Sequence, residues 1–206
     1  MKLNPPWYSS YEKNNYGDFF YSLMRVHRPR KVVELGTKAG YSTYHMARGL
    51  KENGNGTLDC YDLWETYKFN SVPKAIAEKN LRKFKDIVRF ELRDAVGVDK
   101  LYKEIDPVRG RGTLRALATS NGVDILHVDV GNEGEILGNI IPHWIDKIGQ
   151  FIIIEGGSAE RDKIRWMIKY KKAPIAGWLK DFANRRDDIE YFTIEPFPSV
   201  TIIRKI

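Results

Sequence analysis

One short segment constrains the fold of this chain more than any other: an apolar strand that runs into a glycine turn and then into a helix. It covers Val32 to Ser42 and reads VVELGTKAGYS. Gly36 and Gly40 let the backbone turn tightly and approach a ligand, because neither position carries a Cβ. A strand, a glycine turn and a helix in this order are typical of α/β proteins, whose ligands bind at the carboxyl edge of a parallel sheet.

Short β-rich runs alternate with stretches of helical length over most of the chain. This alternation predicts a mainly parallel sheet with helices on both faces. The expected strands are 32–35, 57–61, 88–92, 124–128 and 151–154. The expected helices are 18–27, 42–51, 72–85, 96–105, 114–119 and 135–145.

The C-terminal part departs from this alternation. Two more β-rich runs, 189–194 and 200–203, are separated by only five residues, which permits an antiparallel hairpin but no parallel crossover. We therefore expect an α/β, Rossmann-like fold with a mainly parallel seven-stranded sheet that ends in this hairpin. The whole chain, 1–206, should form a single domain, in which residues 1–30 make an N-terminal arm and helix that could serve as an active-site lid.

Composition and charge indicate which binding partners and which cellular location to expect. The formal net charge of +7 makes nucleic acid worth considering, and the stretch 106–122, with Arg109, Arg111 and Arg115, is the best candidate for a basic loop. Elsewhere basic and acidic residues alternate, which is more typical of solvated helix faces. No apolar run approaches the ~18 residues of a membrane span, and the N-terminus lacks the apolar core of a signal peptide, so we expect a cytoplasmic protein. The single cysteine, Cys60, should be a buried, inert thiol.

The glycine turn itself indicates the kind of ligand. Its G-x-x-x-G spacing, preceded by Glu34, differs from the G-x-G-x-x-G of dinucleotide sites and favours a ligand that carries an amino acid. The free N–H groups at the start of the next helix suit a carboxylate, and Ser42 or Thr43 could add a hydroxyl donor.

Four acidic residues follow the second to fifth strands and should lie along the carboxyl edge of the sheet: Asp62, Asp94, Asp129 and Glu155. Asp62 lies about 20 residues beyond the glycine turn, where a carboxylate can accept both hydroxyls of a ribose. Asp94 could bind the amino group of an adenine. Each of these two is alternatively the cap of a helix.

These motifs resemble the class I S-adenosylmethionine-dependent methyltransferases, and within them the small O-methyltransferases of the catechol and macrocin type. Residues 34–42 are similar to the first motif of that group, and Tyr61-Asp62-Leu63-Trp64 is similar to its second. The resemblance implies S-adenosylmethionine as the cofactor. The contacts it implies are Glu34, Gly36, Thr37, Gly40 and Ser42 around the methionine portion, Asp62 at the ribose, Leu63, Asp94 and Ala95 at the adenine, and Asp129 beside the sulfonium.

The sequence also departs from those relatives. Many of them continue the fourth strand with an Asp-His pair, whereas Asp129 is followed by Val130. Metal-dependent members place Asp-Asp or Asp-Asn after the fifth strand, whereas this chain has Glu155-Gly156. Asp129 and Glu155 could still share a Mg²⁺ ion with water molecules, so metal dependence is open.

Methyl transfer from a sulfonium requires an aligned acceptor and removal of its proton. Our hypothesis is that Asp129 orients the cofactor or metal, and that Glu155 or Glu133 is the base towards a hydroxyl of a small molecule such as a sugar or phenol. Trp7, Tyr8 and Tyr11 could close over a ring-shaped acceptor or could form an ordinary packed arm.

Three other functions are weighed against this one. An RNA methyltransferase would use the arginine loop, a catalytically silent protein would bind the cofactor or act as a scaffold, and a nicotinamide-dependent oxidoreductase is disfavoured by the glycine spacing and the hairpin. We expect a small-molecule acceptor as partner, with nucleic acid less favoured, no membrane, and a homodimer left open.

Overall fold

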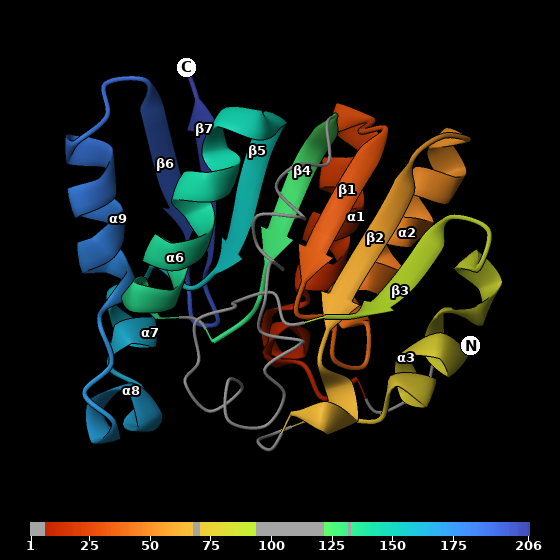
Figure 1. Cartoon of the computed structure of the whole chain (residues 1–206), viewed down its shortest axis with the longest axis horizontal. Helices are drawn as coiled ribbons and strands as arrows, with labels where there is room; N and C mark the ends of the chain where they lie inside the picture. Colours follow the sequence, from red (N-terminus) through yellow and green to blue (C-terminus); the bar gives the residue numbers. More distant parts are fainter. Residues whose placement is uncertain (1–6, 68–70, 94–121, 132) are drawn as a thin grey trace. The chain divides into compact units, whose positions relative to one another are not determined.

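The computed structural model describes residues 7–67, 71–93, 122–131 and 133–206, and the chain divides into two compact units, Met1–Arg93 and Asp94–Ile206 (Figure 1). All seven strands that the sequence predicts are present. The expected helices 96–105 and 114–119, like the arginine loop, lie outside the described residues. The single domain stays a prediction.

The first unit contains three parallel strands in the order β3-β2-β1. Its elements are η1 Ser10–Asn14, α1 Tyr16–His27, β1 Lys31–Leu35, α2 Tyr41–Asn53, β2 Thr57–Asp62, η2 Trp64–Thr66, α3 Lys74–Leu81, η3 Arg82–Phe84 and β3 Val88–Leu92. The strands end at the same edge, so the loops that follow β1 and β2 are neighbours there (Figure 1). Helices α1 and α2 lie side by side and bring Met24 against Gly49, where an added Cβ would lie 2.7 Å from the Met24 Cβ.

The N-terminal segment is packed onto the first unit. The Trp7 ring meets Tyr41 and Tyr44 edge-on, with centroids 5.9 and 5.3 Å apart. Tyr11 is buried and packs edge-on against Phe20 at 5.0 Å. Trp7 and Tyr11 therefore form the packed arm that the sequence left as one of two options, while Tyr8 is 53% exposed.

The second unit contains four strands in the order β4-β5-β7-β6. Its elements are β4 Val123–Val128, α6 Gly134–Trp144, η4 Ile145–Lys147, β5 Ile148–Glu155, α7 Ala159–Asp162, α8 Arg165–Lys169, α9 Ile175–Asn184, β6 Ile189–Ile194 and β7 Val200–Lys205. Strands β4 and β5 are parallel, whereas β7 runs antiparallel to both β5 and β6. The predicted C-terminal hairpin is therefore confirmed.

Helix α9 was not expected from the sequence. Its buried residues Ile175, Leu179 and Phe182 recur at helical spacing and give it an apolar face. The Asp162 carboxylate accepts hydrogen bonds from the backbone N–H groups of Ile175 and Ala176, at 2.7 and 2.9 Å, and so caps the start of the helix. Within the described part of the chain, no helix is both long and apolar enough to cross a membrane.

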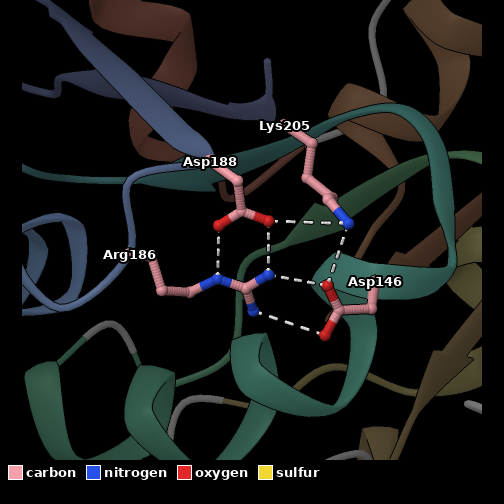
Figure 2. Close-up of polar contacts among 4 residues, drawn as sticks. All are labelled: Asp146, Arg186, Asp188 and Lys205. Atoms are coloured by element: carbon pink, nitrogen blue, oxygen red, sulfur yellow. Dashed lines mark hydrogen bonds and ion pairs between the residues drawn. The ribbon is translucent and has the colours of Figure 1, made fainter.

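Four charged side chains join the end of η4 to the hairpin (Figure 2). Arg186 donates to Asp146 and to Asp188, with 2.7 Å from its Nη2 to an oxygen of each. Lys205 Nζ lies 3.2 Å from Asp146 and 3.6 Å from Asp188. The hydrogen bonds from Arg186 lower the pKa of Asp188 to about 2 and also lower the pKa of Asp146.

This network should make stability depend on acid. A carboxylate with a lowered pKa in the folded state contributes stability above its unfolded pKa of about 3.9, and the contribution is lost as the pH falls through about 2. We expect Arg186→Gln to flatten the fall in unfolding free energy between about pH 4 and pH 2 relative to wild type, measured by urea unfolding. Arg185→Gln removes an equal charge from the adjacent residue, whose side chain donates to the Asp181 carbonyl, and should keep the wild-type slope. Equal slopes for all three proteins would contradict the assignment.

Candidate functional site

The turn between β1 and α2 has a backbone that requires glycine. Gly36 and Gly40 have φ angles of +89° and +88°. A Cβ on Gly40 would lie 2.5 Å from Leu81 Cδ1, so both conformation and space exclude a side chain there. Gly40 is also the residue that caps α2, which places the N–H groups of the first turn of α2 beside the loop.

Glu34, the last but one residue of β1, is fully buried and is bound by hydroxyl groups. Ser42 Oγ donates to it at 2.6 Å, Thr37 Oγ1 donates at 3.2 Å, and Thr43 Oγ1 makes a third bond. The expectation that Ser42 or Thr43 donates to the carboxylate of a ligand is not met, because these hydroxyl protons point to Glu34. Towards a ligand the Ser42 oxygen can only accept, which suits an ammonium group.

Asp62, the last residue of β2, accepts four backbone hydrogen bonds. Its Oδ2 binds the N–H groups of Thr37 and Lys38 at 2.8 and 2.7 Å. Its Oδ1 binds those of Leu63 and Trp64 at 2.6 and 2.8 Å. The carboxylate thus caps the turn into η2, which was the alternative reading of the sequence, and it also fixes the glycine turn.

Trp64 also stabilises this turn, a role that was not predicted from the sequence. Its ring is fully buried against Ala39 and Val72, and its Nε1–H donates to the Lys38 carbonyl at 3.0 Å. Leu63 remains partly exposed. The first unit therefore brings together seven of the predicted cofactor residues: Glu34, Gly36, Thr37, Gly40, Ser42, Asp62 and Leu63. Asp94 and Ala95 lie outside the described residues.

Cys60 is the buried thiol that the sequence predicts. Burial, and secondarily the charge of Glu34, raises the pKa of this thiol well above its usual value. A thiol in this state is a poor nucleophile, so its role is to pack between strands.

In the second unit, Glu155 ends β5 and is buried with a cation. Its Oε2 lies 3.7 Å from Arg161 Nη2, and both side chains are less than a tenth exposed. The chain leaves β5 through Gly156 and Gly157, whose φ angles are +105° and +110°. Thr201 Oγ1 donates to the Gly156 carbonyl at 2.7 Å and fixes this turn to the hairpin.

Glu133 is the N-cap residue of α6, and its two carboxylate oxygens have different environments. Lys172 Nζ lies 3.0 Å from its Oε1. Its Oε2 is buried and, among the described residues, has no hydrogen-bond partner. The Gly134 N–H donates to the Ala173 carbonyl at 2.9 Å, so the segment that carries Lys172 is fixed against the start of α6. Neither Lys172 nor Arg161 was recognised in the sequence, because nothing in its spacing pairs either of them with an acid.

Asp129 follows β4 and is partly exposed. The Glu155 carboxylate does not fit a metal ion shared with Asp129, because Arg161 already supplies a buried positive charge beside it. Over the described ranges, no three His, Cys, Asp or Glu side chains gather as a metal site would require.

Comparison with known proteins agrees with this geometry. The family described as "Methyltransferase domain" matches residues 33–151. A catechol O-methyltransferase of Niastella koreensis is 29% identical over 96 residues, which make up 47% of this chain and 40% of that enzyme. The chain thus spans less than half the length of this curated relative.

Two solved structures show the same fold. An O-methyltransferase from Bacillus cereus in complex with SAH has a TM-score of 0.65 at 16% identity, covering 93% of this chain and 81% of that one. An O-methyltransferase from Streptomyces achromogenes, involved in tomaymycin synthesis and in complex with SAM, has a TM-score of 0.61 at 16% identity, covering 95% and 86%. The expected fold class, a Rossmann-like methyltransferase fold, is confirmed.

The hydroxyl cluster around Glu34 should be a main source of stability for the turn. In Glu34→Gln one carboxylate oxygen is replaced by an NH2 group, which cannot accept a hydrogen bond from a hydroxyl, so we expect the unfolding free energy to fall by about 2 to 3 kcal/mol. Glu52→Gln is the matched control: this residue lies on α2 with its side chain 45% exposed in surface ion pairs, and its replacement should cost much less stability than that of Glu34. Urea unfolding followed by circular dichroism compares the two, and similar losses would refute the role given to Glu34.

Proposed function

The chain belongs to the methyltransferase domain family, and from this premise we propose that it methylates a hydroxyl group of a small molecule, with S-adenosylmethionine as the methyl donor. The observation that carries the proposal is the glycine turn held between Glu34 and Asp62. The likeness to a catechol O-methyltransferase favours oxygen as the acceptor atom.

The residues of the turn fit the cofactor. The N–H groups at the start of α2 suit the carboxylate of its methionine portion, and the Ser42 oxygen suits the ammonium group. Gly36, Thr37 and Gly40 belong to the same turn, and the two glycines have no side chain that could obstruct a ligand. Leu63, Asp94 and Ala95 would contact the adenine. Asp129 would lie beside the sulfonium. When bound, the cofactor supplies a methyl group on a positively charged sulfur.

Asp62 couples the cofactor to the turn. Its oxygens are already occupied by four N–H groups, so ribose hydroxyls would replace some of these donors, with Thr37 and Lys38 as the loop donors released. Cofactor binding and the conformation of the turn are then linked through one carboxylate.

Substitution of Asp62 tests this arrangement. We expect Asp62→Asn to weaken binding of S-adenosylmethionine by roughly 10- to 100-fold in calorimetry, because hydrogen bonds to a charged acceptor are lost. Asp59→Asn changes the same strand at a residue that pairs with Lys31 at 3.6 Å, and should bind as wild type does. Thermal melting of both variants without ligand separates loss of folding from loss of binding. Unchanged affinity in Asp62→Asn would remove Asp62 from the ribose site.

The protein's part in the reaction is to align the acceptor and to take its proton. Glu133 and Glu155 are the candidates for the base, and Asp129 orients the donor. Glu133 is the stronger candidate, because its Oε2 is buried without a partner among the described residues, while Lys172 holds its Oε1. At Glu155, Arg161 offsets the charge.

We expect Glu133→Gln to lower kcat by about 10²- to 10⁴-fold on an acceptor found by screening catechols, phenols and sugars, with cofactor affinity unchanged. Glu155→Gln should reduce kcat less. Glu135→Gln, in the exposed first turn of α6, is the control and should keep full activity. Full activity of both Glu133→Gln and Glu155→Gln would exclude either carboxylate as the base, and cofactor binding without any methyl transfer would favour a catalytically silent protein.

A further inference from the structure

Lys38 lies in the middle of the glycine turn and has a backbone conformation that is unusual for a lysine. Its φ angle is +51°, in the left-handed region that a side chain disfavours and that Gly36 and Gly40 occupy on either side of it. A residue other than glycine stays in this region only where its surroundings hold it there. The contacts of Lys38 should therefore decide whether the turn keeps its shape.

Three groups of Lys38 bind three different parts of the first unit. Its backbone N–H donates to Asp62 Oδ2 at 2.7 Å, and its carbonyl accepts from Trp64 Nε1 at 3.0 Å. Its ammonium group donates to the backbone carbonyl of Tyr8 at 2.7 Å. The first two contacts join the turn to the end of β2 and the segment after it, whereas the third joins the turn to the N-terminal segment.

The N-terminal segment is attached to the proposed cofactor site at a second point. Trp7 is only 8% exposed and packs edge-on against Tyr41 and Tyr44, which belong to the first turn of α2. Residues 7 and 8 therefore contact both parts of the chain that are proposed to hold the methionine portion, the glycine turn and the start of α2.

Cofactor binding would change the balance of these contacts. When ribose hydroxyls bind Asp62, the Lys38 N–H loses its acceptor, while two other contacts of Lys38, to Trp64 and to Tyr8, remain. The left-handed conformation of Lys38 then depends more strongly on these two. Docking of residues 7 and 8 thus contributes more to the turn when the cofactor is bound than when it is absent.

We propose that Lys38 is a positioning residue for the cofactor: its ammonium group couples docking of residues 7 and 8 to occupation of the ribose site at Asp62. This inference rests on the proposed function. Because such coupling is reciprocal, the docked segment strengthens cofactor binding by the same factor by which the cofactor strengthens docking.

Calorimetry with S-adenosylmethionine tests the coupling in a double-mutant cycle of Lys38→Met and Trp7→Ala. The first variant removes the ammonium group, and the second removes the ring that packs the segment onto α2. We expect each single variant to bind the cofactor about fivefold more weakly than wild type, since a contact that positions the turn is lost. The double variant should bind no more weakly than the weaker single variant, because both changes remove the same coupling.

Lys51→Met is the matched control. Lys51 also donates from its ammonium group to a backbone carbonyl, that of Lys83 at 2.9 Å, but it lies in the last turn of α2, away from the glycine turn. This variant should bind the cofactor as wild type does. Lys38→Arg keeps a cationic donor and should recover most of the affinity that is lost in Lys38→Met.

Hydrogen exchange of residues 7–14 measures the coupling from the other side. We expect saturating S-adenosylmethionine to slow exchange in this segment about fivefold in wild type, and to leave it unchanged in Lys38→Met. A residue that only stabilised the fold would alter exchange to the same extent with and without the cofactor. The wild-type comparison requires no variant to fold.

Three results overturn the coupling: an affinity of Lys38→Met equal to that of wild type, additive losses in the double variant, or exchange of residues 7–14 in wild type that the cofactor does not slow. If wild type binds no S-adenosylmethionine, the proposed function and the coupling both fail. If wild type binds it and any of the three results is found, the coupling alone fails.

Discussion

The buried carboxylate of Glu34 is the interaction on which the candidate site depends. A buried charge is costly unless hydrogen bonds satisfy it, and here the donors are hydroxyls on the turn and on the first residues of α2. The need to satisfy Glu34 therefore determines how the chain passes from strand to helix. Asp62 acts on the other side of the same turn through backbone N–H groups. Two acids from neighbouring parallel strands thus fix one loop. Glu34 binds side-chain hydroxyls of the loop and helix start, and Asp62 binds backbone N–H groups of the loop.

Much of the fold could be predicted because its signals are local. Each strand is a short apolar run, and the five-residue link before β7 leaves no room for a crossover helix. Helix α9 has local signals too, since Pro174 precedes an apolar face at helical spacing, but no helix is predicted between the expected strands 151–154 and 189–194. The segment before α9 contains two short helices, α7 and α8, which are interrupted at Lys163 and Ile164.

The site could be predicted only to the level of residue type and strand end. That Asp62 and Glu155 stand at strand ends follows from the sequence, but their partners do not. Asp62 meets Thr37 across 25 positions, and Glu133 meets Lys172 across 39, so both contacts exist only because the fold brings distant segments together. A ribose contact and a cap were weighed as alternatives for Asp62. The structure shows why a single sequence could not separate them, since the carboxylate that caps the turn could exchange some of its N–H donors for the hydroxyls of a ligand.

The two units satisfy their buried acids in different ways. Glu34 is satisfied by neutral hydroxyls within nine positions, whereas Glu133 and Glu155 take cations from the segment that follows β5. Of the six basic residues in the segment 157–174, Arg161 and Lys172 neutralise these acids. These two ion pairs contribute nothing to the net charge of +7, because each cation is matched by the carboxylate that it neutralises. It follows that Arg161 cannot be used to separate binding from catalysis, because its removal would leave the buried Glu155 carboxylate uncompensated.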